Sequence, residues 1–397
     1  MTIRHICRAM LLSSMPVLLS IVAVAQDDSA ARLKKDLAAL AGQEMAGRGN
    51  GQEGLGKAVK YLLDTYKKMG LNPRKQPFTL QSARVQNSNE PEIQLNNVIV
   101  VIKGSDPDLC NEYIVIGAHL DHLGTRPGQG GAKPTIFYGA DDNGSGSVAL
   151  IELVRHFHKN PPARSLVFIH FSGEEWGLLG SGHWVANPTI DIKSVRFMVN
   201  MDMIGRFDNE KAVLTFTAMG MGAKDIERAK ELAPEGVTIE ADRGTSVFAQ
   251  ASDHAPFASK GIPTCFLFTG IHPDYHKATD NIEKINFGGL ATIAKFAISL
   301  VTEYATSAEV PKFQPVGDLG IFFIASKESN TVAFVRPNGA ASSAGLKSGD
   351  VLTHINEYTI ETPKDYRAAL DNSNRGDKVK IKWLRGDVAM EADVVLK

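Results

Sequence analysis

The 397-residue sequence carries almost no net charge, because 43 lysine and arginine residues face 44 aspartate and glutamate residues. It has no basic block of the kind that binds nucleic acid and no acidic tail of the kind that stays disordered. It also lacks internal repeats and low-complexity tracts. With 43% hydrophobic residues, the composition indicates an ordinary globular protein that is long enough for more than one domain.

Beyond residue 25, no stretch is long and apolar enough to span a bilayer. Near the N-terminus, two arginines and a histidine precede an apolar run over residues 10–24, and Ala23-Val24-Ala25 fits a cleavage site. We therefore expect residues 1–25 to be a signal peptide, and the mature protein to be periplasmic or secreted with no membrane contact. An uncleaved anchor is the alternative, but two serines and a proline interrupt the run and favour cleavage.

Cysteine is scarce, with three residues in the whole chain. Cys7 lies in the expected signal peptide, which leaves Cys110 and Cys265. Export permits a disulfide between these two, and the sequence leaves this pairing and two buried thiols open. Neither cysteine has the spacing of a zinc thiolate site.

Strand-like and helical segments alternate over most of the chain. Apolar runs of strand length cover residues 97–103, 113–118, 165–171, 195–201, 212–217 and 264–268. Helical spacing of apolar residues covers residues 30–41, 53–69, 145–157, 178–185, 222–232 and 285–305. This order predicts an α/β fold, a three-layer sandwich with a mostly parallel mixed sheet, whose ligands bind beyond the carboxyl ends of the strands.

Two adjacent carboxylates, Glu174 and Glu175, follow the buried strand predicted at 165–171. Adjacent side chains diverge at a strand end, so one can bind a metal while the other faces a substrate. A Glu-Glu pair alone is weak evidence, because most such pairs are solvated surface. Other polar blocks follow other strand-like runs or short loops, at residues 117–122, 139–144, 200–203 and 274–276.

Five residues of these blocks form a set of oxygen and nitrogen ligands without sulfur: His119, Asp141, Glu175, Asp202 and His276. Such a set suits zinc in a catalytic role. Five ligands are too many for one tetrahedral ion with an open position. They suit two Zn²⁺ ions about 3.5–4 Å apart, if one carboxylate bridges them and a shared water is activated between them.

Asp121 stands two residues after His119, so the two side chains point the same way on an extended segment. The Asp121 carboxylate can therefore accept the imidazole N–H and fix the ring. His122 and His272 lie near the predicted site without an assigned role.

Residues 33–305 resemble the dizinc aminopeptidases, the family of secreted bacterial leucine-type aminopeptidases and more distant glutamate carboxypeptidases. Five blocks carry the resemblance in the same order: residues 117–122, 139–146, 172–181, 200–205 and 272–280. The resemblance implies a zinc exopeptidase fold with one zinc held by His119 and Asp202 and the other by Glu175 and His276. It also implies that Asp141 bridges the ions and that the Asp141-Asp142 peptide is cis.

The same resemblance implies that Glu174 is the general base and that peptides with a free N-terminus are the substrates. Tyr275 would donate its hydroxyl to the oxyanion, and a packing role is the alternative. Residues 252–257 also resemble a family block near the substrate pocket, although Ser252 capping a local helix explains them equally well. The short stretch at 80–112 leaves little room for the protease-associated insert of many relatives.

The C-terminal region has a different pattern of short strands and resembles a PDZ domain. The matching blocks are residues 317–321, 344–352 and 376–377. We expect domains at 1–25 (signal peptide), 26–305 (catalytic), 306–315 (linker) and 316–397 (PDZ). A PDZ domain adds a peptide as a strand and holds its carboxylate with backbone N–H groups, here of Leu319, Gly320 and Ile321. A purely structural module is the alternative.

The sequence therefore predicts metal-dependent removal of N-terminal residues from peptides by an exported enzyme with a PDZ module. A carboxypeptidase, a dipeptidase or a glutaminyl cyclase of the same fold remains an alternative. A non-catalytic PDZ-bearing binding protein is another, although relatives of that kind lose ligands and none of the five is missing here.

Overall fold

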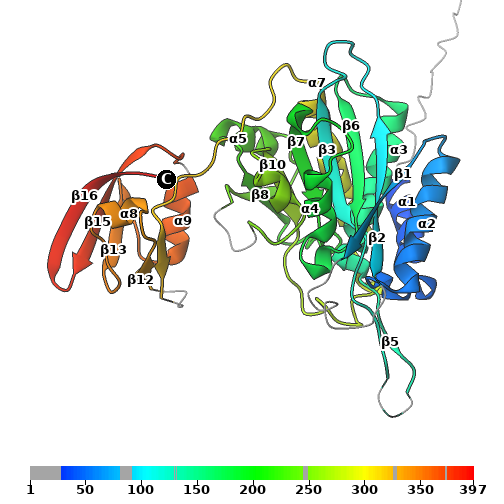
Figure 1. Ribbon diagram of the computed structural model, residues 1–397, viewed down its shortest axis with the longest axis horizontal. Coiled ribbons are helices and arrows are strands. Elements are labelled where there is room, and N and C mark those ends of the chain that lie inside the picture. The colour runs from blue at the N-terminus through cyan, green and yellow to red at the C-terminus, as the bar shows by residue number, and fades with distance from the viewer. Residues whose placement is uncertain are drawn as a thin grey trace, which may run out of the picture.

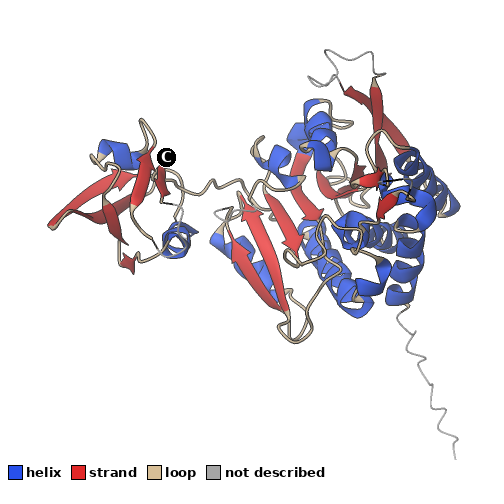
Figure 2. Ribbon diagram, turned by 90° about the horizontal axis from the view of Figure 1, so that it is seen from below, coloured by secondary structure: helices blue, strands red, loops and turns tan. Residues whose placement is uncertain are grey.

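The computed structural model describes residues 28–80, 92–128, 130, 132–244, 249–324, 329–371 and 373–397. These residues form two lobes that lie side by side and are joined by one chain segment (Figures 1 and 2). The predicted signal peptide lies outside the described residues. Within the described ranges, no helix combines the length and apolar character that crossing a membrane requires. Cys110 and Cys265 are free thiols.

The larger lobe is built on an eight-stranded mixed sheet with the order β1-β2-β6-β3-β7-β10-β8-β9. The strands are β1 (Arg74–Leu80), β2 (Ile93–Ile102), β3 (Tyr113–His119), β6 (Ser165–Phe171), β7 (Val195–Met201), β8 (Val213–Met219), β9 (Thr238–Asp242) and β10 (Thr264–Phe268). The four central strands β6, β3, β7 and β10 are parallel to one another. Every residue of β6 is buried, because helices cover both faces of the sheet.

Helices form the two outer layers. One face packs against α1 (Ser29–Leu40), α2 (Glu53–Lys68), α3 (Gly146–Lys159), α5 (Ala223–Glu231) and α7 (Phe287–Thr306). The other face packs against α4 (Leu179–Ala186) and α6 (His254–Ala258). Successive side chains of β6 alternate between the two cores, with Phe168 in the first and Val167 in the second. The predicted three-layer α/β fold is confirmed.

The carboxyl ends of the central strands lie next to one another. His119 at the end of β3 pairs with Phe171 at the end of β6, and Leu267 of β10 pairs with Met201 of β7. The polar blocks that follow these strands therefore meet at one edge of the sheet.

The glycine-rich segment at 124–139 contains a short antiparallel hairpin, β4 (Gly124–Arg126) and β5 (Thr135–Phe137). The hairpin projects from the lobe (Figure 1), and the Arg126 guanidinium lies 4.5 Å from the centre of the Phe137 ring. Strands of three residues are too short to give a periodic signal in the sequence.

The smaller lobe has its own core. Its elements are β11 (Ile321–Phe323), β12 (Val332–Val335), α8 (Ala340–Ser343), β13 (Val351–Ile355), β14 (Tyr358–Thr359), α9 (Pro363–Asp371), β15 (Lys378–Arg385) and β16 (Val388–Val395). The strands β14-β13-β15-β16 form one antiparallel sheet, and β11 pairs with β12. The predicted small β-rich domain is confirmed.

Candidate metal centre and active site

The side chain of Asp142 lies between two groups of candidate metal ligands. Its Oδ1 is 3.3 Å from Nε2 of His119, and its Oδ2 is 3.2 Å from Nε2 of His276. Asp142 follows β5 and precedes α3, and only 3% of the residue is exposed. One carboxylate thus offers one oxygen to each of two neighbouring groups.

The first group consists of His119, Asp142 and Asp202. His119 ends β3 and Asp202 follows β7, so adjacent parallel strands deliver them. Nε2 of His119 lies 3.2 Å from Oδ1 of Asp202. The Asp202 carboxylate is fixed from behind, because the Ser252 hydroxyl donates to its Oδ2 at 2.7 Å. Ser252 therefore holds the Asp202 carboxylate and does not cap α6.

The second group contains Asp142 and Glu175 with two histidines. Nε2 of His276 lies 3.1 Å from Oε2 of Glu175, and Nδ1 of His122 lies 2.7 Å from Oε1 of the same carboxylate. The His122 nitrogen is 3.6 Å from Oδ2 of Asp142. His122 is thus a member of the site, although no role was assigned to it from the sequence.

The prediction that Asp141 bridges two ions is wrong, because the next residue, Asp142, occupies the position between the two ligand groups. Oδ1 of Asp141 accepts the Gly205 N–H at 2.6 Å, and its Oδ2 lies 3.2 Å from Nε2 of His272. Asp141 therefore points away from the two ligand groups, and Asp142 takes its place. The cis peptide shifts with it, since the bond between Asp142 and Asn143 is cis and the predicted Asp141-Asp142 bond is not.

Buried polar groups hold the loop that carries Asp142. The Asp280 carboxylate accepts the N–H groups of both Asp141 and Asp142 at 3.0–3.2 Å. The Asn143 amide donates to the Met201 carbonyl at 2.9 Å. Gly139 has a φ of 56°, and a Cβ there would come within 2.5 Å of the His122 ring, so only glycine fits.

Asp121 holds the turn that carries Glu174 and Glu175. Its carboxylate accepts the N–H of Glu174 at 3.1 Å, the N–H of Glu175 at 3.3 Å and the amide of Asn50 at 2.6 Å. Nδ1 of His119 lies 3.1 Å from the main-chain oxygen of Asp121 but 3.8 Å from its carboxylate. The prediction that the carboxylate fixes the ring is corrected: the main-chain carbonyl does so, and the carboxylate positions the glutamates.

Glu174 and Tyr275 border the two ligand groups. Oε2 of Glu174 lies 3.9 Å from Nε2 of His119. Burial raises the pKa of Glu174 well above its usual range, and the charges of Asp202 and Asp253 act in the same direction while His119 opposes them. The Tyr275 ring stacks on the His276 ring with 3.8 Å between centroids and is about one-third exposed.

The electrostatics of the site favour positive charge. Burial alone would raise the pKa of Asp142, but the charge on His122 and the nearby imidazole nitrogens of His119 and His276 lower it. Burial lowers the pKa of His119, but the charges of Asp202 and Glu174 outweigh burial and raise it well above its ordinary value. The site therefore carries more negative charge on its carboxylates than its histidines can balance. Bound metal ions would supply the missing positive charge.

The residues present fit zinc. Two ligands at tetrahedral positions 2.0–2.1 Å from a zinc ion lie about 3.3 Å apart. The separations of 3.1–3.3 Å that connect His119, Asp142, Asp202, Glu175 and His276 have this size. Moreover, Oδ2 of Asp142 is buried without a hydrogen-bond donor of suitable geometry. All of the donor atoms are nitrogen or oxygen, as in catalytic zinc sites.

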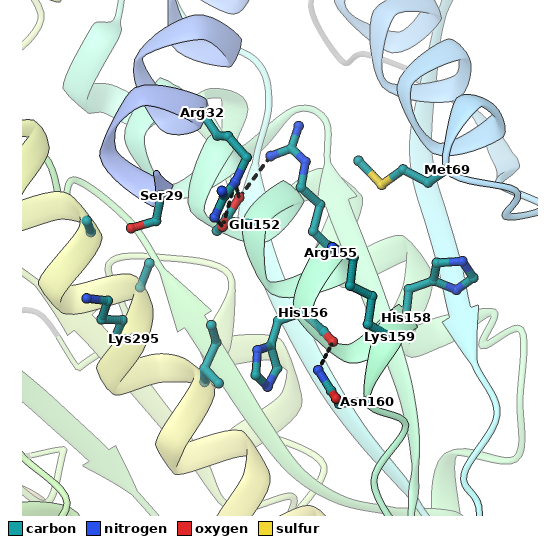
Figure 3. A pocket seen from close by; sticks show the side chains of 13 residues that line it. Ser29, Arg32, Met69, Glu152, Arg155, His156, His158, Lys159, Asn160 and Lys295 are labelled. Atoms are coloured by element: carbon teal, nitrogen blue, oxygen red, sulfur yellow. Dashed lines mark hydrogen bonds and ion pairs between the residues drawn. The ribbon is translucent and has the colours of Figure 1, made fainter. Parts of the chain in front are cut away.

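A cavity of about 510 Å³ between α1, α3 and α7 lies elsewhere (Figure 3). It is lined by residues at the C-terminal end of α3, whereas Asp142 precedes the N-terminal end of this 14-residue helix. Arg32 and Arg155 beside it already pair with Glu152. The cavity is therefore separate from the candidate metal centre, because its lining on α3 begins at Glu152, about 9 Å along the helix from Gly146.

The arrangement of the larger lobe matches known proteins. The family model of peptidase family M28 matches residues 97–301, slightly more than half of the 397 residues. The chain belongs to peptidase family M28. A model of the PDZ domain matches residues 317–396, so this M28 chain carries a PDZ domain at its C-terminal end.

Among the relatives of this M28 chain is leucine aminopeptidase 1 of Arthroderma otae. It is 30% identical over 254 residues, which cover 57% of this chain and 64% of that relative. The chain spans somewhat more than half the length of the curated relatives it matches.

Two solved structures show the shared fold. The zinc aminopeptidase BSAP from Bacillus subtilis is 17% identical with a TM-score of 0.57, covering 72% of this chain and 98% of that one. The glutaminyl cyclase of Bacteroides thetaiotaomicron is 20% identical with a TM-score of 0.54, covering 69% of this chain and 97% of the cyclase. The fold alone therefore does not separate a peptidase from a cyclase.

Proposed function

We propose that this M28 chain is an exported aminopeptidase that uses two Zn²⁺ ions to hydrolyse peptides at a free N-terminus. The observation that carries the proposal is Asp142, whose two oxygens face two groups of histidines and carboxylates. A shared carboxylate is the usual connection in two-metal hydrolases.

His119, Asp142 and Asp202 would hold one ion, and Asp142, Glu175 and His276 the other. His276 is favoured over His122 because its nitrogen lies 3.1–3.2 Å from both carboxylates, the separation expected of two ligands on one ion. The His122 nitrogen lies 2.7 Å from Glu175, which is a hydrogen-bond distance. His122 would therefore hold Glu175 in place.

Bound zinc would supply a water of lowered pKa and a Lewis acid beside the scissile carbonyl. Glu174 would take a proton from the attacking water and return it to the leaving amine. Asp121 would act through Glu174, because it fixes the N–H groups of the Glu174–Glu175 turn.

Tyr275 would donate its hydroxyl to the oxyanion that develops on the carbonyl. Its ring stacks on His276, which places the side chain at the rim of the second ligand group. The free α-amine of the substrate would dock against the carboxylates of the site, and we therefore expect unblocked peptides to be preferred. Both roles rest on the two-zinc assignment.

The PDZ domain would bind the C-terminal end of a peptide or protein. One of the three N–H groups predicted to bind the peptide carboxylate is already occupied, because the N–H of Gly320 donates to Oδ1 of Asp318 at 2.8 Å. Leu319 and Ile321 remain the candidate donors. Binding of a peptide with a free C-terminus, and not of its amidated form, to the intact protein would support this role.

Export rests on the composition of residues 1–25. Arg4 and Arg8 precede the apolar run, and the small residues at 23–25 fit a cleavage site. N-terminal sequencing of the mature protein would test this, with a chain starting at Gln26 as the expected result. A mature chain that still begins at Met1 would contradict it.

The activity is tested on the purified protein with matched free, N-acetylated and N-terminal glutamine peptides. We expect release of the first residue from free peptides only, loss of release on chelation, recovery with zinc, and two zinc ions per chain. Cyclisation of N-terminal glutamine without release would make the chain a cyclase. Release from the C-terminal end would make it a carboxypeptidase, and a chain that binds no metal would refute the proposal.

A further inference from the structure

A short segment at residues 46–50 runs between the two loops that carry the candidate ligands. Ala46, Gly47 and Arg48 have consecutive φ values of 45°, 71° and 52°. Left-handed backbone is unfavourable at the two residues that are not glycine and persists only where the surroundings enforce it. A Cβ at Gly47 would come within 2.2 Å of the Phe137 carbonyl oxygen, so the segment is packed tightly against the end of β5.

Arg48 is fully buried, and its guanidinium donates to four main-chain carbonyls. Nε donates to Leu120 at 2.7 Å, Nη1 to Leu40 at 2.7 Å and Tyr138 at 2.9 Å, and Nη2 to Gly139 at 2.7 Å. Leu120 lies between His119 and Asp121, and Gly139 lies three residues before Asp142. One side chain therefore connects the loop of one ligand to the loop of the shared ligand.

The backbone around Arg48 strengthens the same connection. The N–H of His122 donates to the Arg48 carbonyl at 3.1 Å, and Gly49 forms a β-bridge with His122. The amide of Asn50 donates to the Asp121 carboxylate at 2.6 Å. The segment thus contacts both the residues that follow β3 and the turn before Asp142.

Arg48 differs from an ordinary buried arginine in its partners. No carboxylate of the described residues lies within ion-pair distance of it, and its hydrogen bonds go to neutral carbonyls. Arg164 is as deeply buried and also donates to main-chain carbonyls, but it pairs directly with Glu112. A buried charge without a close counter-ion is costly, which calls for a compensating role.

The surrounding charges belong to the metal centre. Burial lowers the pKa of Arg48 to about 10, against the opposing effect of Asp142, Asp280, Asp121 and Glu175. Arg48 therefore stays protonated at neutral pH, with all five N–H donors available to hold the fork geometry.

We propose that Arg48 is a positioning residue of the metal centre, which fixes the separation of His119 from Asp142 by holding both of their loops. This inference rests on the two-zinc site of the proposed function. It predicts that zinc affinity depends on the guanidinium even though Arg48 touches neither a ligand nor the substrate.

The experiment compares Arg48→Met with Arg164→Met. Arg164 directly precedes β6, at the opposite end of that strand from Glu174, so it is a matched buried arginine far from the site. Zinc affinity is measured by competition with a chromophoric chelator, and folding by thermal unfolding of the metal-free protein. We expect both variants to unfold more readily, and only Arg48→Met to bind zinc about 10- to 100-fold more weakly.

The direction of the change in zinc affinity distinguishes loss of positioning from loss of the positive charge. Removing a nearby positive charge would by itself tighten zinc binding, so unchanged or tighter binding in Arg48→Met overturns the inference. Equal weakening in Arg164→Met overturns it as well, since the effect would then be general destabilisation. A wild-type protein that binds no zinc refutes the proposed function and this inference with it.

If a methionine variant does not fold, the same comparison is made with the two lysine variants, Arg48→Lys and Arg164→Lys. Lysine retains the charge but has three donors on one atom, and it cannot reach all four carbonyls. We expect Arg48→Lys to bind zinc about tenfold more weakly and Arg164→Lys to match the wild type. Wild-type affinity in Arg48→Lys would show that charge without the fork suffices, which contradicts the positioning role.

Discussion

Glu174 and Glu175 are neighbours in sequence but belong to different parts of the site. Glu175 contacts His122 and His276, whereas Glu174 points toward His119. The tight turn that carries both glutamates is possible because the flanking Gly173 and Gly177 take φ values of 81° and 103°. Asp121 then holds both N–H groups, so two identical side chains acquire separate tasks.

The first prediction concerns Glu174. Glu174→Gln keeps the size of the side chain but cannot accept a proton from water. We expect kcat to fall about 10²- to 10⁴-fold with two zinc ions still bound. Steady-state kinetics and metal analysis of the same preparation would measure this. Glu152→Gln, a buried glutamate outside the site, is the control and should retain turnover once folded.

Near wild-type turnover in Glu174→Gln with both metals present would remove Glu174 from the mechanism. Loss of metal together with turnover would instead make Glu174 a ligand, which contradicts the assignment of the ligands. The two readouts therefore distinguish a base from a ligand.

The second prediction separates the two histidines of the second ligand group. His276→Asn should lose one zinc ion at a zinc concentration that saturates the wild type, because a ligand is removed. His122→Asn should keep both ions, because its role is a hydrogen bond to Glu175. Metal content after equilibrium dialysis measures this. Loss of one ion from His122→Asn alone would exchange their roles.

The sequence alone could not show whether Asp141 or Asp142 lies between the two ligand groups. Both aspartates belong to one matching block, and the block identifies the site without its register. The backbone decides the register, since Asp280 and Gly205 hold the loop so that Asp142 faces the ligands and Asp141 faces His272. His122 was missed for a similar reason, because a histidine beside a site gives no sign of its direction.

At the scale of elements, β6 links the helices of one layer. His170 near its end is buried, with Nε2 at 2.7 Å from the Tyr66 hydroxyl of α2 and Nδ1 at 3.3 Å from the Ser147 hydroxyl of α3. Burial lowers the pKa of His170 from 6.5 to about 3. The imidazole is therefore neutral in the folded protein at all but strongly acidic pH.

The third prediction is an acid-sensitive contribution from His170. Between pH 6.5 and about 3 the unfolded chain binds a proton that the folded chain does not, so stability falls as the pH falls. The loss from this group is at most about 1.4 kcal/mol per pH unit. His170→Gln lacks the titrating group, so its unfolding free energy should fall less steeply over this range.

Urea unfolding of the metal-free variant and wild type at about pH 4.5 and 6.5 measures this difference in slope. His158→Gln is the control, because that side chain is exposed at the end of α3. Parallel pH dependence in His170→Gln and wild type would show that His170 is not buried as a neutral ring.

Buried strands were predicted more accurately from the sequence than exposed edge strands. The strands at 165–171, 195–201 and 264–268 were predicted with their observed ends, because they are mostly apolar and almost entirely buried. β16 was missed, since most of its residues are exposed and a one-sided edge strand gives little apolar pattern. β9, at the edge of the large sheet, was missed because only one of its five residues is fully buried, which gives little apolar pattern.

At the scale of the whole molecule, the segment between the lobes is attached to the larger lobe over part of its length. The sequence predicts a linker at 306–315. The N–H of Gln314 donates to the Gly220 carbonyl at 2.8 Å, and the Phe313 ring leaves no room for a Cβ at Gly220. Such a contact joins residues far apart in sequence and leaves no local pattern, so it could not be predicted.

Arg243 connects the two lobes at this place. It follows β9 and is 4% exposed, and its guanidinium donates to the carbonyls of Met221 and Gln314 and to Oδ1 of Asn374 at 2.8–3.2 Å. It also donates to the carbonyl of Asp371, the last residue of α9, at 3.1 Å. One buried side chain therefore holds the larger lobe, the connecting segment and the PDZ domain together.

The last prediction is that Arg243→Met frees the PDZ domain from the larger lobe. The variant leaves several buried carbonyls without a donor, at about 1–3 kcal/mol each, and water can satisfy them only if the lobes separate. We expect a larger radius of gyration in solution scattering and faster cleavage within residues 306–315 by an added endoprotease. Arg228→Met is the control, because this exposed arginine of α5 pairs only across the surface with Glu231 and Glu303 among the described residues. If Arg243→Met keeps the wild-type radius and protease resistance, the lobes are held by other contacts, with Phe313 on Gly220 as the next to test.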